Sequence, residues 1–137
     1  MIVDKNQCSC YLSNEAGLRI LNKVEAEFSN LVKAFRKRHM GKGPREVKTT
    51  FCKCWAICEM SGNLSSVEKF IANAEDGKQT LREARTQMVK ELYKTHHPIE
   101  MEQLLGVNYI DLFVDIDIEK DFGMSIFVFD QDIQHKF

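Results

Sequence analysis

A basic loop with two glycines is the part of the sequence whose residue types most clearly suggest chemistry. Residues 33–48 carry seven Lys or Arg and one acid, Glu46. Backbone N–H groups exposed by glycines can form an anion-binding concavity, and cationic side chains add charge to it. The candidate residues for binding an anion or a partner are Arg36, Lys37, Arg38, Met40, Gly41, Lys42, Gly43, Pro44 and Arg45.

An architectural interpretation of the same loop competes with anion binding, and we favour it. The loop follows a predicted helix, whose C-terminal end has a negative partial charge that repels anions and is stabilised by cations. Gly41 can take the positive φ that ends a helix, and Pro44 prevents its continuation. Binding by the adjacent basic surface stays open.

Five cysteines form the next candidate group, for a soft metal such as zinc or for an iron–sulfur cluster. The weak candidate ligands are Cys8, Cys10, Cys52, Cys54 and Cys58. Their spacing lacks the usual C-x₂-C knuckle, and free cysteine is commonly a small buried hydrophobe. The odd count without a signal peptide indicates reduced thiols. We expect neither a metal nor a cofactor.

Catalysis and nucleic-acid binding have weaker support. His96 and His97 could approach the acids at 111, 115 and 117, but histidines at a helix end more often cap it. No nucleophile triad or phosphate-binding motif can be placed, so we expect no enzyme. RNA or DNA binding through the basic segment 33–48 is an alternative based on charge. However, a KH-type loop joins two helices, whereas this one leads into a strand.

The elements that must position these residues follow from hydrophobic periodicity. Apolar positions three and four apart predict one long helix from about Asn14 to Met40. Period-two patterns then predict strands from Val47 to Cys52 and from Trp55 to Met60, joined by a short turn. Ser65 and Glu68 form a capping box that starts a second helical region.

That second region carries apolar residues at 67, 70 and 71, is expected to break near Gly77, and resumes with apolar residues at 81, 84, 88 and 92. Pro98 to Gly106 predicts a short helix. Residues 109–118 alternate strictly, with Ile110 on the core face, and Met124 to Asp130 returns as the last strand. The fold class is therefore α+β, helix–β-hairpin–helices–β-hairpin, with a four-stranded antiparallel sheet and helices packed on one face.

Bulk properties favour a single soluble domain of 137 residues. A chain of this length can bury one core without disulfides, and its composition is that of an ordered globular protein. No window approaches the ~18 consecutive apolar residues of a transmembrane helix, and no leader is recognisable. The net charge of −1 combines +6 in residues 33–48 with −7 elsewhere. This asymmetry gives one end of the molecule a positive field.

Several segments together resemble the MpsC-like domain family, formerly a bacterial domain of unknown function and associated with a sodium-translocating, membrane-potential-generating system. The resemblance rests on the Met40-Gly41-Lys42-Gly43-Pro44 loop, the Gly62-Asn63-Leu64-Ser65 step and the Asp76-Gly77-Lys78 kink. Asp115-Ile116 and Phe127-Val128-Phe129 in the closing hairpin also match. The resemblance covers about residues 18–132. We expect a single domain 1–137 with a loosely ordered lead-in at 1–12, an MpsC-like core at 13–132 and a frayed tail at 133–137.

The resemblance implies a small cytoplasmic accessory or regulatory protein. We expect a non-enzymatic interaction module whose basic end meets a protein partner, such as a membrane transporter subunit. The long first helix is expected to outrun the core and leave apolar surface for a homodimer. Nucleic acid is not the expected partner.

Overall fold

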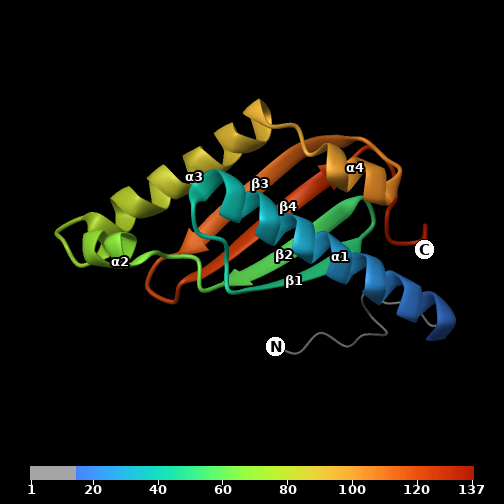
Figure 1. Cartoon of the computed structure of the whole chain (residues 1–137), viewed down its shortest axis with the longest axis horizontal. Helices are drawn as coiled ribbons and strands as arrows, with labels where there is room; N and C mark the ends of the chain where they lie inside the picture. Colours follow the sequence, from blue (N-terminus) through green and yellow to red (C-terminus); the bar gives the residue numbers. More distant parts are fainter. Residues whose placement is uncertain (1–14) are drawn as a thin grey trace.

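The computed structural model describes residues 15–137, so the predicted lead-in at 1–12 lies outside the described residues. Its helices and strands follow the predicted order (Figure 1). The elements are α1 (Glu15–Met40), β1 (Glu46–Cys52), β2 (Trp55–Ser61), α2 (Ser66–Ala72), α3 (Gly77–Thr95), α4 (Ile99–Leu105), β3 (Tyr109–Asp117) and β4 (Phe122–Phe129). No helix in this part of the chain is long and apolar enough to cross a membrane.

The four strands form one antiparallel sheet in the order β1-β2-β4-β3, which confirms the predicted α+β class. The two hairpins are joined edge to edge, with Trp55 opposite Val128 and Ile57 opposite Ile126. Helices α1 and α4 lie over one face of the sheet, and α3 lies along β3 (Figure 1). The other face carries no described helix.

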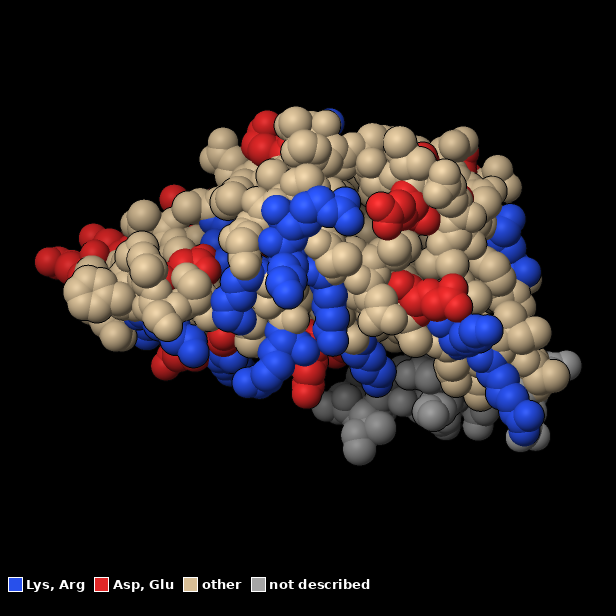
Figure 2. All heavy atoms as spheres, in the orientation of Figure 1, with Lys and Arg blue, Asp and Glu red and all other residues tan. Residues whose placement is uncertain are grey.

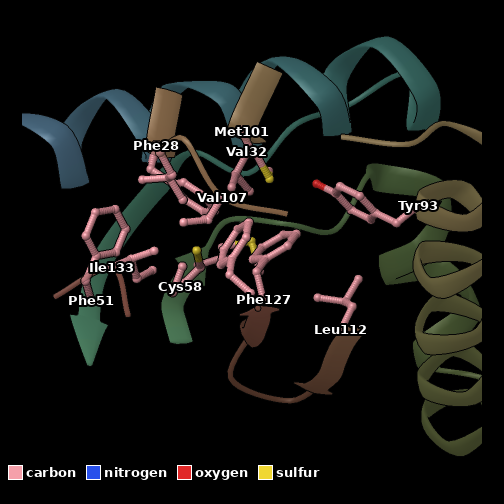
Figure 3. Packing of buried hydrophobic residues seen from close by; sticks show 14 of the residues in the cluster. Phe28, Val32, Phe51, Cys58, Tyr93, Met101, Val107, Leu112, Phe127 and Ile133 are labelled. Carbon is pink, nitrogen blue, oxygen red and sulfur yellow. The ribbon is translucent and has the colours of Figure 1, made fainter. Parts of the chain in front are cut away.

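The core lies between α1 and the covered face of the sheet (Figure 3). Phe28 of α1 is fully buried and meets Phe51 and Phe127 edge-on, with ring centroids 5.7 Å and 5.4 Å away. Tyr93 brings α3 into this cluster by stacking on Phe35 at 3.9 Å. Because each aromatic side chain buries roughly 150–250 Å², this cluster anchors α1 and α3 to the sheet.

Local signals placed the boundaries of the second helical region correctly. The capping box is present: Ser65 Oγ accepts from the Glu68 N–H, and the Glu68 carboxylate accepts from the Ser65 N–H. The break also occurs, because α2 ends at Ala72 and Asp76 takes a φ of 57° before α3 begins at Gly77. A Cβ at Gly77 would lie only 1.8 Å from the Ile71 carbonyl oxygen, so only glycine fits there.

The buried faces of this region differ from the prediction. Helix α2 buries no residue, and Phe70 is 80% exposed because α2 packs mainly against α3. Helix α3 buries Arg85 and Val89 instead of Ala84 and Met88. Its orientation against β3 selects the stripe that is buried, and periodicity within the helix does not contain that information.

Two predictions near the C-terminus are wrong. A register shift between Tyr109 and Asp111 interrupts the alternation, so Ile110 is 60% exposed and does not lie on the core face. The tail is packed, not frayed. Ile133 and Gln134 are fully buried, and Gln134 Oε1 accepts from the Lys53 N–H at 3.0 Å. These bonds satisfy the backbone of the β1–β2 turn, where Lys53 has a φ of 57°.

Candidate functional site

The glycine-proline loop ends α1 as its sequence predicts. Gly41 has a φ of 80°, and its N–H donates to the Lys37 carbonyl at 3.1 Å. The chain then turns back along the helix and passes close to its backbone. A Cβ on Gly43 would lie only 2.9 Å from the Lys33 carbonyl oxygen. Pro44 is buried at the start of the strand. The two glycines therefore serve a C-cap and a close backbone approach.

The same loop is fastened to the end of β2. The Arg45 N–H donates to the Ser61 carbonyl at 2.9 Å and to the Gly62 carbonyl at 3.2 Å. The Lys42 ammonium donates to the Gly62 carbonyl at 2.7 Å. Two backbone donors of the supposed anion cradle, at Gly41 and Arg45, are thus already used. These contacts favour the architectural interpretation of the loop over an anion-binding concavity.

Arg36 does not belong to the basic surface, which corrects its assignment as a candidate site residue. It is only 3% exposed, and its Nη2 donates to Ser125 Oγ at 3.0 Å. Burial lowers the pKa of its guanidinium. The reason is helical spacing, since position 36 continues the buried stripe of Phe28 and Val32. That spacing was visible in the sequence and outweighs the charged type of the residue.

Arg38 is also separated from the other cations of the predicted site. It points toward α4, where its Nη1 lies 4.0 Å from the Glu100 carboxylate. Next to it the rings of His39 and His96 stack 4.1 Å apart, in a cavity of about 290 Å³. Partial desolvation and the nearby His96 and Arg38 lower the pKa of His39. A neutral, stacked imidazole beside a cation suits packing between α1 and α3 better than proton transfer.

Four cations remain neighbours on one surface, which we name the basic surface: Lys33, Lys37, Lys42 and Arg45. Lys33 is half-buried and the other three are exposed. Lys33 and Lys37 are one helical turn apart, and both lie against the loop at Gly43. Within residues 15–137, none of the four forms an ion pair. Lys and Arg side chains gather over this end of α1 and the neighbouring strand (Figure 2). Lys33 also lines a pocket with Glu46 and Glu59. The excess positive charge of the basic surface is therefore concentrated at Lys37, Lys42 and Arg45.

The cysteines of the first hairpin do not converge on a metal site. Cys58 is fully buried and faces the core, where burial raises the pKa of its thiol to about 12. Cys54 is a free thiol in the turn, and Cys52 is disulfide-bonded, which differs from the expectation of reduced thiols. Cys8 and Cys10 lie outside the described residues. The described part of the chain contains no group of three or more His, Cys, Asp or Glu side chains arranged to hold a metal.

The histidines and aspartates considered together in the sequence are also separated. His97 Nε2 lies 2.8 Å from Glu102 Oε1 at the start of α4. Asp115 instead meets Arg82 of α3, with Nε–Oδ1 and Nη2–Oδ2 distances of 2.9 Å and 2.7 Å. This bidentate pair lowers the pKa of Asp115.

The Arg82–Asp115 pair borders a cavity of about 490 Å³ between the start of α3 and the β3–β4 hairpin. Sequence reasoning missed Arg82, because no spacing within α3 indicates which strand it will meet. Both members of the pair are largely exposed, so the pair docks α3 on β3 without excluding water.

Comparison with known proteins gives two matches. A family model described as the Na⁺-translocating membrane potential-generating system (MpsC) matches residues 21–131. The uncharacterized protein YrhF of Bacillus subtilis (strain 168) is 37% identical over 116 residues, which are 85% of this chain and 95% of YrhF. No solved structure matches this chain.

Proposed function

The chain belongs to the MpsC family, as its motifs indicated, and from that premise we propose that it is a non-enzymatic cytoplasmic accessory protein of a membrane ion-transport system. In this proposal the basic surface docks on an acidic protein surface of that system. The family description supplies the association with a Na⁺-translocating, membrane potential-generating system. The observation that carries the docking site is four neighbouring cations, none of which forms an ion pair within residues 15–137.

The geometry of the basic surface supports docking better than catalysis. Three of its four cations are exposed, Lys33 is half-buried, and none of the four is a histidine or a hydroxyl or thiol nucleophile, which argues against proton transfer at this surface. Positive charge at the end of a helix and along an adjacent strand attracts an acidic partner over about a Debye length, ~8–10 Å. The fastened loop holds the charges in place, which reduces the entropy lost on binding.

A charge-reversal experiment tests the docking site with a closely matched control. Lys33→Glu with Lys37→Glu reverses two cations one turn apart, the second in the last turn of α1. Lys90→Glu with Lys94→Glu makes the same change near the end of α3, with Lys94 in its last turn. Both variants change the net charge equally and strain the helix dipole alike.

The assay measures binding of purified protein to inverted membrane vesicles from cells that carry the transport system, stripped of peripheral proteins. We expect wild-type protein and the α3 variant to bind, and the α1 variant to lose about tenfold in affinity at low salt. Equal binding by both variants would contradict the proposal. Protease treatment of the vesicles should abolish binding; binding that survives, and that vesicles of phosphatidylglycerol reproduce, would show a lipid partner instead.

The functional association has a separate test. Deletion of the gene should reduce the Na⁺-dependent membrane potential, measured with a potential-sensitive dye. Wild-type protein and the α3 variant should restore the potential, and the α1 variant should not. An unchanged potential in the deletion strain would exclude the accessory role even if the protein binds membranes.

A further inference from the structure

The face of the sheet away from α1 and α4 carries seven apolar side chains, and Glu59 of β2 lies on the same face opposite Met124. Alternate residues of β2, β3 and β4 point to this side, opposite the buried Ala56, Cys58 and Phe127. Trp55 is 39% exposed and Phe113 is 57% exposed. We name this surface the open face; its apolar members are Trp55, Ile57, Phe113, Phe122, Met124, Ile126 and Val128.

The strand register makes the open face continuous. Trp55 lies opposite Val128, and Ile57 lies opposite Ile126. Ile126 in turn lies opposite Phe113 on the outer strand β3. Cross-strand neighbours on one face are ~4.5–5.5 Å apart, so these side chains touch and form a single patch over three strands.

The size of this patch suits a protein interface. With each large side chain offering roughly 150–250 Å², the exposed fractions leave on the order of 400 Å² of apolar area. The largest patch on a typical monomer is ~300–600 Å² and often functional. With its polar rim, the open face approaches the ~800 Å² that each partner contributes to a standard interface.

The two edges of the open face carry opposite charges, negative along β3 and positive along part of β1. Asp111, Asp115 and Asp117 project from β3 on this side, and Asp115 is already paired with Arg82 of α3. On the other edge Lys48 projects from β1, and Lys53 Nζ lies 6.0 Å from the centre of the Trp55 ring. A two-fold axis parallel to the strands and between two stacked sheets places β1 of one copy over β3 of the other.

This symmetry brings complementary charges together at one end of the sheet. Trp55, Val128 and Asp111 are neighbours across three strands, and Lys53 lies in the turn just beyond them. The two-fold axis therefore places Lys53 of one copy next to Asp111 of the second copy. At the opposite end Glu46 would face Asp117, which favours overlap centred on Trp55, Ile57 and Ile126. Two sheets packed face to face cross at about 30°, which permits close contact at one end and separation at the other.

We propose that the open face is the interface of a two-fold symmetric dimer of this chain. The proposal does not depend on the basic surface, which lies on α1 and the loop beyond it. This interface differs from the dimer expected from the sequence, which used apolar surface on α1. The sheet covers the apolar stripe of α1. Among the large hydrophobic residues of the described part of α1, only Ile20 is mostly exposed.

The oligomeric state of two matched variants tests the interface. Phe113→Asp places a charge in the open face, and Phe70→Asp places the same charge on the exposed helix α2. Light scattering after size exclusion should give dimers for wild-type protein and Phe70→Asp at about 100 µM. Phe113→Asp should dissociate at least about tenfold more readily.

Trp55 supplies an independent readout, because it is the only tryptophan of the chain. Its emission should shift to shorter wavelength as wild-type protein is concentrated from about 1 to 100 µM, and should not shift in Phe113→Asp. Circular dichroism checks that both variants fold.

A charge exchange keeps the proposal testable if Phe113→Asp does not fold. Asp111→Lys should weaken the dimer, and Lys53→Asp in the same chain should restore it. A monomer at about 100 µM would overturn the proposal, and so would a Trp55 emission independent of concentration. Equal dissociation by Phe113→Asp and Phe70→Asp, or failure of the exchange to restore association, would also contradict it.

Discussion

Replacing Arg36 by methionine is expected to stabilise the protein, although the side chain lies in the core. Arg36 is 3% exposed, and among the described residues its guanidinium donates a hydrogen bond to Ser125 Oγ. Its Nε has no hydrogen-bond partner within residues 15–137, and the interaction with the neighbouring Tyr93 hydroxyl offsets only part of the desolvation that lowers the pKa of Arg36. No carboxylate from that part of the chain pairs with it.

The magnitude follows from two opposing contributions. Removing an ion from water costs several kcal/mol even after relaxation, and one hydrogen bond from a charged group returns about 1.5–3 kcal/mol. Methionine fills much of the same volume and avoids the desolvation cost, but leaves Ser125 without its donor at a cost of about 1 kcal/mol. We expect the free energy of unfolding to rise by about 1–2 kcal/mol, with a Tm increase of about 3–6 °C.

Urea unfolding followed by circular dichroism measures this change. The denaturation midpoint should increase at an unchanged slope, since the exposed surface is similar. Lys37→Met, one position along on the exposed side of the helix, should change stability by less than about 0.5 kcal/mol. If Arg36→Met lowers the free energy of unfolding by more than about 1 kcal/mol, the guanidinium is a net stabilising group and the reasoning is wrong.

Three further predictions concern the fold. Gly77→Ala should destabilise by about 3 kcal/mol or more in the same urea assay, because its Cβ would meet the Ile71 carbonyl oxygen at 1.8 Å; a loss below about 1 kcal/mol would contradict the packing. Iodoacetamide at pH 8 should modify Cys54 and spare Cys58, whose buried thiol has its pKa raised to about 12, until urea unfolds the chain; mass spectrometry of peptides would show either result. Glu68 has a lowered pKa because hydrogen bonds from Ser65 and Arg85 outweigh its desolvation, so its stabilisation exists at neutral pH and is lost as pH falls through that pKa. Glu68→Gln should therefore cost about 1 kcal/mol at pH 7, and its difference from wild type should shrink toward pH 3; a constant difference would argue against this linkage.

The boundaries of the elements could be predicted from the sequence because their causes are local. Gly41 ends α1, the Ser65–Glu68 capping box starts α2, and the chain breaks before Gly77. Each signal acts through backbone groups within about four residues. The family could likewise be predicted, since its motifs are short runs at these boundaries.

The content of the basic site could be predicted only in part. Seven Lys or Arg side chains within residues 33–48 predicted a positively charged end of the molecule. Helical spacing could have removed Arg36 from the surface, because it repeats the positions of Phe28 and Val32. The separation of Arg38 could not be predicted, since it depends on the acid that α4 presents at Glu100.

The remaining features depend on contacts between distant segments. Pairing of β2 with β4 makes one sheet of two hairpins and collects Trp55, Ile126 and Phe113 on the open face. Docking of Gln134 on the β1–β2 turn orders a segment without a local pattern. By itself the sequence determined the elements, their ends, the family and the charge of one end. Only the tertiary structure decided which faces are buried, because burial depends on partners that periodicity along one segment does not specify.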